Sequence, residues 1–334
     1  MSDRDLAGVA SAIEHLNWHL LALNHTCQIV DVLIPDDELV ITGDKLIIDM
    51  STLYLRDNKE KLVRERFRRL GLSIPWTIIT SDVTYYGKNE PNIVYYPIYL
   101  IDGILKGRDT TINIKHNRQH LACFLTYHLH YHRLLMFIAL HNQPWFNSCL
   151  VNLQEVSKMT SSQLQGYTNG CDSLTDDEKN QAIELLKLAP LVADTNDQQI
   201  EIVDINNKAF RDACVNIFTE SDYPNGNFIT EKSIKPFLSG QIPAVIAHPT
   251  VYKHLEELGF DMLNECINLN TDTLDIRYNI AHLMKEVDQL STNIEEKWNN
   301  SYTQRLHNYN LARSPDLINN LTRDLRKWLE LHGV

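Results

Sequence analysis

Two lysines, Lys232 and Lys235, lie where the chain is expected to begin a short helix. Thr230 can cap this helix through its hydroxyl, and Gly240 marks its end. The helix dipole disfavours cations in a first turn, and a bound phosphate would remove the conflict. Glu231, beside Lys232, can accept a hydrogen bond from a sugar hydroxyl. The alternative is that Thr230 only caps the helix, Glu231 balances the dipole and both lysines are solvated.

The segments around this helix predict a parallel sheet. An apolar run at residues 215–218 ends at Thr219 and Glu220, and a turn-rich loop follows. Beyond the helix, residues 242–247 predict a strand and residues 249–259 a second helix. This order of strands and helices is typical of βαβ units. Glu220 thus follows a strand end, where open α/β sheets bind ligands, although a solvated loop carboxylate is the alternative.

The sequence FITEKSIKPFLSGQIPAVIAHP, at residues 228–249, resembles the nucleotide-sugar half of GT-B glycosyltransferases. It is most similar to the fucosyltransferase-like branch and its relatives encoded by bacteria and large phages, over roughly residues 120–262. The resemblance implies that Glu231 meets the ribose of the donor and Lys232 its diphosphate, with Gly240 and Pro243 completing the motif. It also implies that Glu220 or its neighbour Thr219 faces the donor.

Arg133 is a second candidate for the donor phosphates. Residues 120–127 predict a strand, residues 133–141 a helix and residues 148–153 another strand, which is how the second domain of the resembled family begins. In that family an arginine at the start of the helix reaches the phosphates, and a guanidinium can bind phosphate oxygens with two N–H groups. The resemblance therefore assigns phosphate contact to Arg133, and His132 is expected to touch phosphate or sugar. A solvated arginine is the alternative.

The first half of the chain predicts an α/β domain that carries the general base. Strands are expected at residues 27–34, 45–50, 76–80 and 93–101, and helices at residues 5–23 and 56–70. Transfer with inversion needs a group that accepts the acceptor's proton, whereas a retaining route needs none. Asp49, Asp82 and Asp102 all follow predicted strand ends, and Asp82 is our choice because a turn-like segment follows it.

The remaining predicted elements complete the expected organisation of the chain into two domains. Residues 154–174 predict a loop, 175–188 a capped helix, 200–204 a strand, 209–215 a helix, 276–290 an apolar-striped helix and 315–331 a last helix. With the resemblance, the expected fold class is α/β and GT-B-like. Two Rossmann-like domains would face a cleft, with a helical C-terminal segment that crosses back to the first domain. The expected domains are an acceptor-side domain at 1–118, a nucleotide-sugar-binding domain at 119–290 and C-terminal helices at 291–334.

Composition indicates a globular protein of the cytoplasm. The 334 residues are 43% hydrophobic and 22% charged, without an apolar run of ~18 residues, so no membrane span is expected. The six cysteines form no CxxC pair, and the first residues carry no signal-peptide pattern. His128, His130 and His132 alternate along the chain, but they have no carboxylate or cysteine partner at ligand spacing. No metal or other cofactor is expected beyond the nucleotide-sugar donor.

The acceptor stays open between two classes. The net charge of −12 arises almost entirely from residues 151–334, whereas residues 59–69 are locally basic. Arg64 and Arg68 in that stretch would bind a polyanion such as double-stranded phage DNA, whose hydroxymethylated base would have to leave the stack, whereas the net charge of −12 argues against general nucleic-acid affinity. A glycan acceptor is the alternative, with the basic stretch as an ordinary exposed helix face. A non-catalytic protein of the same fold, binding nucleotide-sugar or nucleic acid, is the rival to an enzyme.

Overall fold

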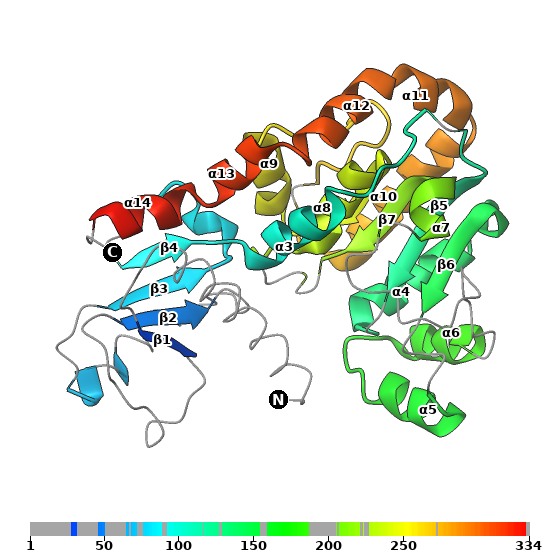
Figure 1. Cartoon of the computed structure of the whole chain (residues 1–334). Coiled ribbons are helices and arrows are strands. Elements are labelled where there is room, and N and C mark those ends of the chain that lie inside the picture. Colours follow the sequence, from blue (N-terminus) through cyan, green and yellow to red (C-terminus); the bar gives the residue numbers. More distant parts are fainter. Residues whose placement is uncertain are drawn as a thin grey trace. The chain divides into compact units, whose positions relative to one another are not determined.

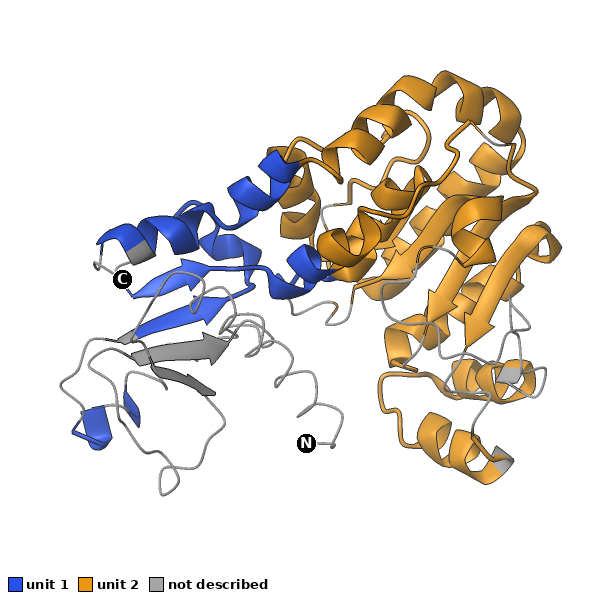
Figure 2. Ribbon diagram, viewed as in Figure 1, with its two compact units in different colours: residues 1–102, 225–230, 315–334 blue, residues 103–224, 231–314 orange. Residues whose placement is uncertain are grey.

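The computed structural model describes residues 28–31, 46–50, 65–66, 68–71, 76–88, 92–115, 117–126, 129–153, 159–186, 205, 207–220, 223, 227–271 and 273–331. The chain divides into two compact units, shown in blue and orange in Figure 2. Unit 1 comprises residues 1–102, 225–230 and 315–334, and unit 2 comprises residues 103–224 and 231–314. Each unit contains a parallel sheet, so the α/β class is confirmed.

Unit 1 contains a four-stranded sheet whose strands follow one another in chain order (Figure 1). These strands are β1 (Gln28–Asp31), β2 (Leu46–Met50), β3 (Trp76–Thr80) and β4 (Ile93–Tyr95). All neighbouring pairs are parallel, which confirms the first three expected strands. Ile78 and Ile79 of β3 are fully buried, because strands of a parallel sheet are covered on both faces.

The C-terminal segment belongs to the same unit. It forms α13 (Pro315–Leu321) and α14 (Arg323–Leu331), rather than the single helix expected from the sequence. α14 packs against β4, and the Asp324 carboxylate accepts a 2.9 Å hydrogen bond from the backbone N–H of Gly87.

The expected strand at residues 93–101 is wrong beyond Tyr95. Residues 98–107 form α3 (Ile98–Gly107) instead. Pro97 cannot donate to a sheet ladder, but its restricted φ suits a helix start, and its carbonyl accepts from the N–H of Ile101 at 3.0 Å. An apolar run of this length does not distinguish a strand from a buried helix. Asp102 therefore lies within a helix, so the reason for considering it as a general base at a strand end no longer holds.

Unit 2 contains a four-stranded parallel sheet in the order β6-β5-β7-β8. The strands are β5 (His120–Thr126), β6 (Cys149–Leu153), β7 (Ala213–Thr219) and β8 (Ile242–Ile246), and all four were expected at these places. Every residue of β7 and β8 is buried, as expected for the interior of a doubly covered sheet.

Two groups of helices accompany this sheet. One group contains α4 (Tyr131–His141), α6 (Asp176–Leu186) and α10 (Ile276–Ser291), and α4 packs against the other two. The other contains α7 (Lys208–Asp212), α8 (Glu231–Ser239) and α12 (Tyr302–Leu311), and α8 packs against its two companions. Right-handed crossovers place α4 and α8 on opposite faces, because β6 and β8 extend the sheet in opposite directions. The predicted apolar stripe of α10 is buried throughout.

Two expectations in unit 2 are corrected. The stretch predicted as a loop at residues 154–174 contains α5 (Ser161–Asn169), started by a capping box between Thr160 and Gln163. The helix predicted at 209–215 is α7, which ends at Asp212, because the following residues are fully buried in β7. The capped helix predicted after Thr175 is α6, and the Glu178 carboxylate accepts from the Thr175 N–H at 2.7 Å as expected.

A buried arginine links the C-terminal end of α8 to α11 and α12, the two helices that follow α10. Arg305 of α12 is 1% exposed and donates hydrogen bonds to the carbonyls of Gly240 (3.1 Å), Ile114 (3.2 Å) and Trp298 (2.7 Å). Trp298 belongs to α11 (Ile294–Asn300), and its ring centroid lies 3.3 Å from the guanidinium carbon. Gly240 itself has a φ of +65°, the left-handed conformation expected of a glycine that ends a helix.

Several predictions lie outside the described residues. They are the helix at 5–23, the strand at 200–204, His128 and Arg64.

Candidate functional site

The sheet of unit 2 has a topological switch point between β5 and β7. From β5 the chain moves outward to β6, and it later returns to place β7 on the other side of β5. In open α/β sheets, ligands bind in the crevice outside the carboxyl ends of the two strands at such a point. The expected donor-site residues of unit 2 belong to the segments that leave these strands. His132 and Arg133 lie in the first turn of α4, Thr219 is the last residue of β7 and Glu220 follows it.

Glu220 is joined to the first turn of α8. Its side chain is 2% exposed, and its Oε1 accepts a 2.6 Å hydrogen bond from the hydroxyl of Ser233, which is itself 1% exposed. The backbone N–H of Glu220 donates to the carbonyl of Ile246 at the end of β8. Glu220 is therefore a buried, oriented carboxyl group, and the solvated alternative is wrong. Ser233 was not selected from the sequence, because nothing in its local pattern indicates a partner 13 residues away.

Glu231 and Lys232 form a partly buried ion pair at the start of α8. Their Oε1 and Nζ atoms are 3.2 Å apart, and the side chains are 8% and 25% exposed. Burial opposes ionisation of Glu231, but the charges of Lys232 and Lys235 outweigh it and hold the pKa of this carboxyl below its usual value. Lys235 is half-buried, with its Nζ 5.7 Å from the centre of the Phe210 ring. The view of both lysines as fully solvated is therefore also wrong.

His132 is a buried, neutral imidazole in positive surroundings. It is 2% exposed, and within the described part of the chain neither ring nitrogen makes a hydrogen bond of normal geometry. Its ring stacks on that of His130 with centroids 5.4 Å apart. Burial, together with the charges of Arg133, His130 and Lys232, lowers the pKa of His132 to about 3, although a hydrogen bond with the backbone of Glu220 acts in the opposite direction. Arg133 and Lys232 therefore both place positive charge near the His132 ring.

Two further buried polar groups belong to this site. The hydroxyl of Thr219 is buried without a hydrogen-bond partner among the described residues. Arg133 is only 4% exposed, so the alternative of a solvated arginine is wrong. Buried polar atoms are normally hydrogen-bonded, and exceptions frequently mark a missing ligand or water. A ligand with several acceptor oxygens would suit the Thr219 hydroxyl, the His132 ring and the two cations.

The remaining predicted residues belong to unit 1. Asp82 follows β3 and is 3% exposed, and its Oδ1 accepts from the N–H (2.9 Å) and the hydroxyl (2.7 Å) of Thr84. It thereby caps the short 3₁₀ helix η1 (Val83–Tyr85) and forms an antiparallel bridge with Phe228. Thr230 is buried directly before α8 in the chain, and Arg68 is exposed. The structure thus groups His132, Arg133, Glu220, Glu231 and Lys232 in one unit, and Asp82, Thr230 and Arg68 in the other.

Among the described residues, no three His, Cys, Asp or Glu side chains form a group that could hold a metal ion. Over the same residues, none of the helices is both long and apolar enough to pass through a bilayer. Comparisons of the chain with protein-family models, curated proteins and solved structures find no match.

Proposed function

We propose that this protein is a glycosyltransferase that uses a nucleotide-diphosphate sugar, with a GT-B-like arrangement of two α/β domains. The observation that carries the proposal is the buried polar cluster at the switch point of the unit 2 sheet. There, the Thr219 hydroxyl has no hydrogen-bond partner among the described residues, and the buried His132 ring makes no more than a weak hydrogen bond with the backbone of Glu220, beside the charges of Arg133 and Lys232. A diphosphate is a compact dianion rich in acceptor oxygens, so it complements this lining.

Each residue then has a role in donor binding or departure. Arg133 and Lys232, with Lys235 nearby, neutralise the diphosphate as it leaves, which is the step at which negative charge develops. His132, neutral at physiological pH, donates a hydrogen bond from one ring nitrogen. Glu231 accepts from a ribose hydroxyl, and its ion pair with Lys232 holds both side chains in place. Glu220, oriented by Ser233, faces the sugar.

Unit 1 would bind the acceptor and deprotonate its hydroxyl. Asp82 is the proposed base, and its hydrogen bonds from Thr84 would orient the carboxylate. Arg68 is exposed and available to a polyanion such as DNA. Binding to duplex DNA that weakens with salt and is lost in Arg64→Glu/Arg68→Glu would support a DNA acceptor. Failure to bind at any salt concentration would leave a glycan acceptor.

Calorimetry with a panel of uridine and guanosine diphosphate sugars tests the donor site. Lys232→Ala and Glu231→Ala should each weaken binding by about 10- to 100-fold, the loss of one charge-assisted hydrogen bond of about 1.5–3 kcal/mol. Lys253→Ala and Glu257→Ala are matched controls, because these two residues form an exposed pair on α9 (Pro249–Glu257). Unchanged donor affinity in the first two variants would overturn the proposal. Turnover, measured as hydrolysis of the bound nucleotide-sugar, distinguishes an enzyme from a non-catalytic binding protein.

A further inference from the structure

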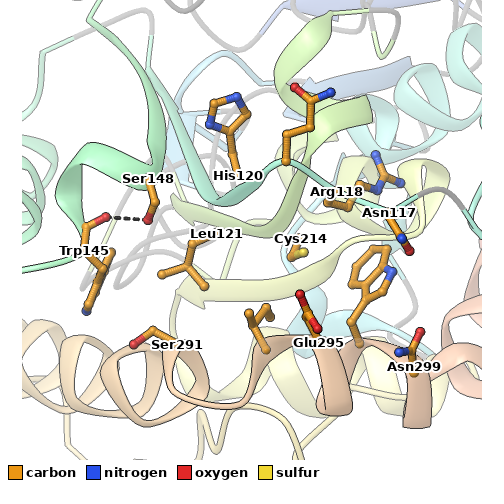
Figure 3. Close-up of a pocket in the computed structure, with 13 residues that line it drawn as sticks. Asn117, Arg118, His120, Leu121, Trp145, Ser148, Cys214, Ser291, Glu295 and Asn299 are labelled. Atoms are coloured by element: carbon orange, nitrogen blue, oxygen red, sulfur yellow. Dashed lines mark hydrogen bonds between the residues drawn. The ribbon is translucent and has the colours of Figure 1, made fainter.

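A hollow in unit 2 lies away from the proposed donor site, with none of the donor-site residues in its lining. It is a cavity of about 500 Å³, within the range of small-molecule sites. Its upper wall in Figure 3 comes from the chain entering β5, where Asn117, Arg118 and His120 lie, and Cys214 near the start of β7 lines it as well. Because β5 and β7 are parallel, these residues mark the amino edge of the sheet, opposite the carboxyl ends at the switch point.

The opposite wall is helical and polar. Ser291 ends α10, and Glu295 and Asn299 lie one turn apart on α11 and line the same cavity (Figure 3). Gln119 and Asn117 supply further amides across from them. Each amide offers both donors and an acceptor, and a carboxylate accepts from two neighbouring donors. This lining suits a ligand whose every polar group both donates and accepts, which is the property of hydroxyl groups.

The charges in the cavity disfavour an anionic ligand. Both terminal nitrogens of Arg118 are already engaged: Nη1 donates to the carbonyls of Phe210 (2.7 Å) and Arg211, and Nη2 to that of Ser239 (2.9 Å). Burial lowers the pKa of Arg118 to about 10. Arg118 therefore supports the wall rather than binding a ligand anion, and the Glu295 carboxylate would repel one.

Aromatic surface completes the lining. Trp145 and Trp298 both line the cavity, and Trp145 is held by a 3.2 Å hydrogen bond from its indole N–H to Asp288. The Trp298 ring already packs against the guanidinium of Arg305, so Trp145 supplies the apolar ring surface that remains. An apolar ring beside amides and a carboxylate suits a ligand with both C–H faces and hydroxyl edges. We propose that this cavity binds a neutral saccharide of one or two sugar units, as a second carbohydrate site distinct from the donor site.

Saturation-transfer NMR and calorimetry on the whole chain test this site. The probes are glucose, galactose, N-acetylglucosamine, maltose and cellobiose. At least one should bind, and Asn299→Ala and Glu295→Gln should each weaken it by about tenfold, the effect of one lost hydrogen bond. Asn300→Ala and Glu296→Gln are matched controls, because both residues are exposed neighbours on the same helix and do not line the cavity. These controls should bind as the unaltered protein does.

Lys232→Ala separates this proposal from the previous one, because it should weaken donor binding by about 10- to 100-fold and leave saccharide binding unchanged. Saccharide binding that is insensitive to Asn299→Ala but is abolished by a nucleoside diphosphate would overturn the second site. Absence of binding at about 10 mM for all five probes would overturn it as well. Tighter binding of glucose 6-phosphate than of glucose, sensitive to Glu295→Gln, would refute the assignment to a neutral ligand.

Discussion

Substitution of Gly240 by alanine should destabilise unit 2 more than any ordinary glycine substitution. Gly240 ends α8 with a φ of +65°, and a Cβ built there lies 1.8 Å from Cγ2 of Ile114. The two backbones cannot simply move apart, because Arg305 donates to the carbonyls of both residues. Alanine would therefore add backbone strain and a steric clash at the same place.

The expected magnitude follows from these two parts. A left-handed conformation costs a non-glycine residue about 1–2 kcal/mol. Inserting a carbon into a closed contact costs about 1–3 kcal/mol. Gly240→Ala should therefore lower the free energy of unfolding by about 2–5 kcal/mol. Gly259→Ala is the matched control: it also has a positive φ, +96°, but its Cβ would meet Leu311 at an ordinary 3.4 Å. It should show the backbone strain without the clash.

Urea unfolding followed by circular dichroism measures both variants, and a double-mutant cycle with Ile114→Ala isolates the clash. Once the Ile114 side chain is shortened, adding alanine at 240 should cost only about 1–2 kcal/mol, so the coupling energy is about 1–3 kcal/mol. A cost for Gly240→Ala no larger than that for Gly259→Ala would refute the reasoning. So would an equal cost in the two Ile114 backgrounds.

Three further outcomes are expected. Ser233→Ala leaves the buried Glu220 carboxyl without its 2.6 Å donor and should cost about 1–3 kcal/mol in urea unfolding; an unchanged midpoint would contradict the hydrogen bond. Folding lowers the pKa of His132 from 6.5 to about 3, so the unfolded chain takes up a proton first as the pH falls. The free energy of unfolding should therefore fall below pH 6.5, by up to about 1.4 kcal/mol per pH unit from this group. His132→Asn should flatten the dependence of this free energy on pH between pH 7 and 5, and the same slope in both proteins would exclude the effect. Arg305→Lys should cost about 2–4 kcal/mol, since an ammonium cannot reproduce the planar fork that serves three carbonyls; full stability would show that those bonds are dispensable.

Much of unit 2 was predictable because its signals are local. The apolar runs of β7 and β8 are bounded by turns, and the helices after them end at Gly240 and Gly259. Helix α5 was missed although Thr160 and Gln163 carry its capping box, because the segment lacks the apolar periodicity on which the prediction relied. α3 was mistaken for a strand for the opposite reason, since its apolar residues are continuous and periodicity cannot separate the two structures.

The features of the candidate site are likewise of two kinds: those that local sequence signals indicate and those that only the fold creates. Arg133, Glu220 and Lys232 were selected because strand ends and helix starts are recognisable along the chain. The bond from Ser233 to Glu220 and the missing partners of His132 were not recognisable, because both depend on residues brought together by the sheet. The cavity between the start of β5 and α11 gave no sequence signal at all, since its walls come from segments more than 150 residues apart.

For this protein, the sequence by itself determined the order of strands and helices, the ends of several helices and the polar residues at the strand ends. These depend on side chains within a few positions of one another. Only the tertiary structure decided that β7 lies beside β5 and that Ser233 donates to Glu220. It likewise decided that the imidazole of His132 is buried and neutral. Strand order and burial are sums over non-local contacts, and a pKa follows from the desolvation and charges that those contacts create.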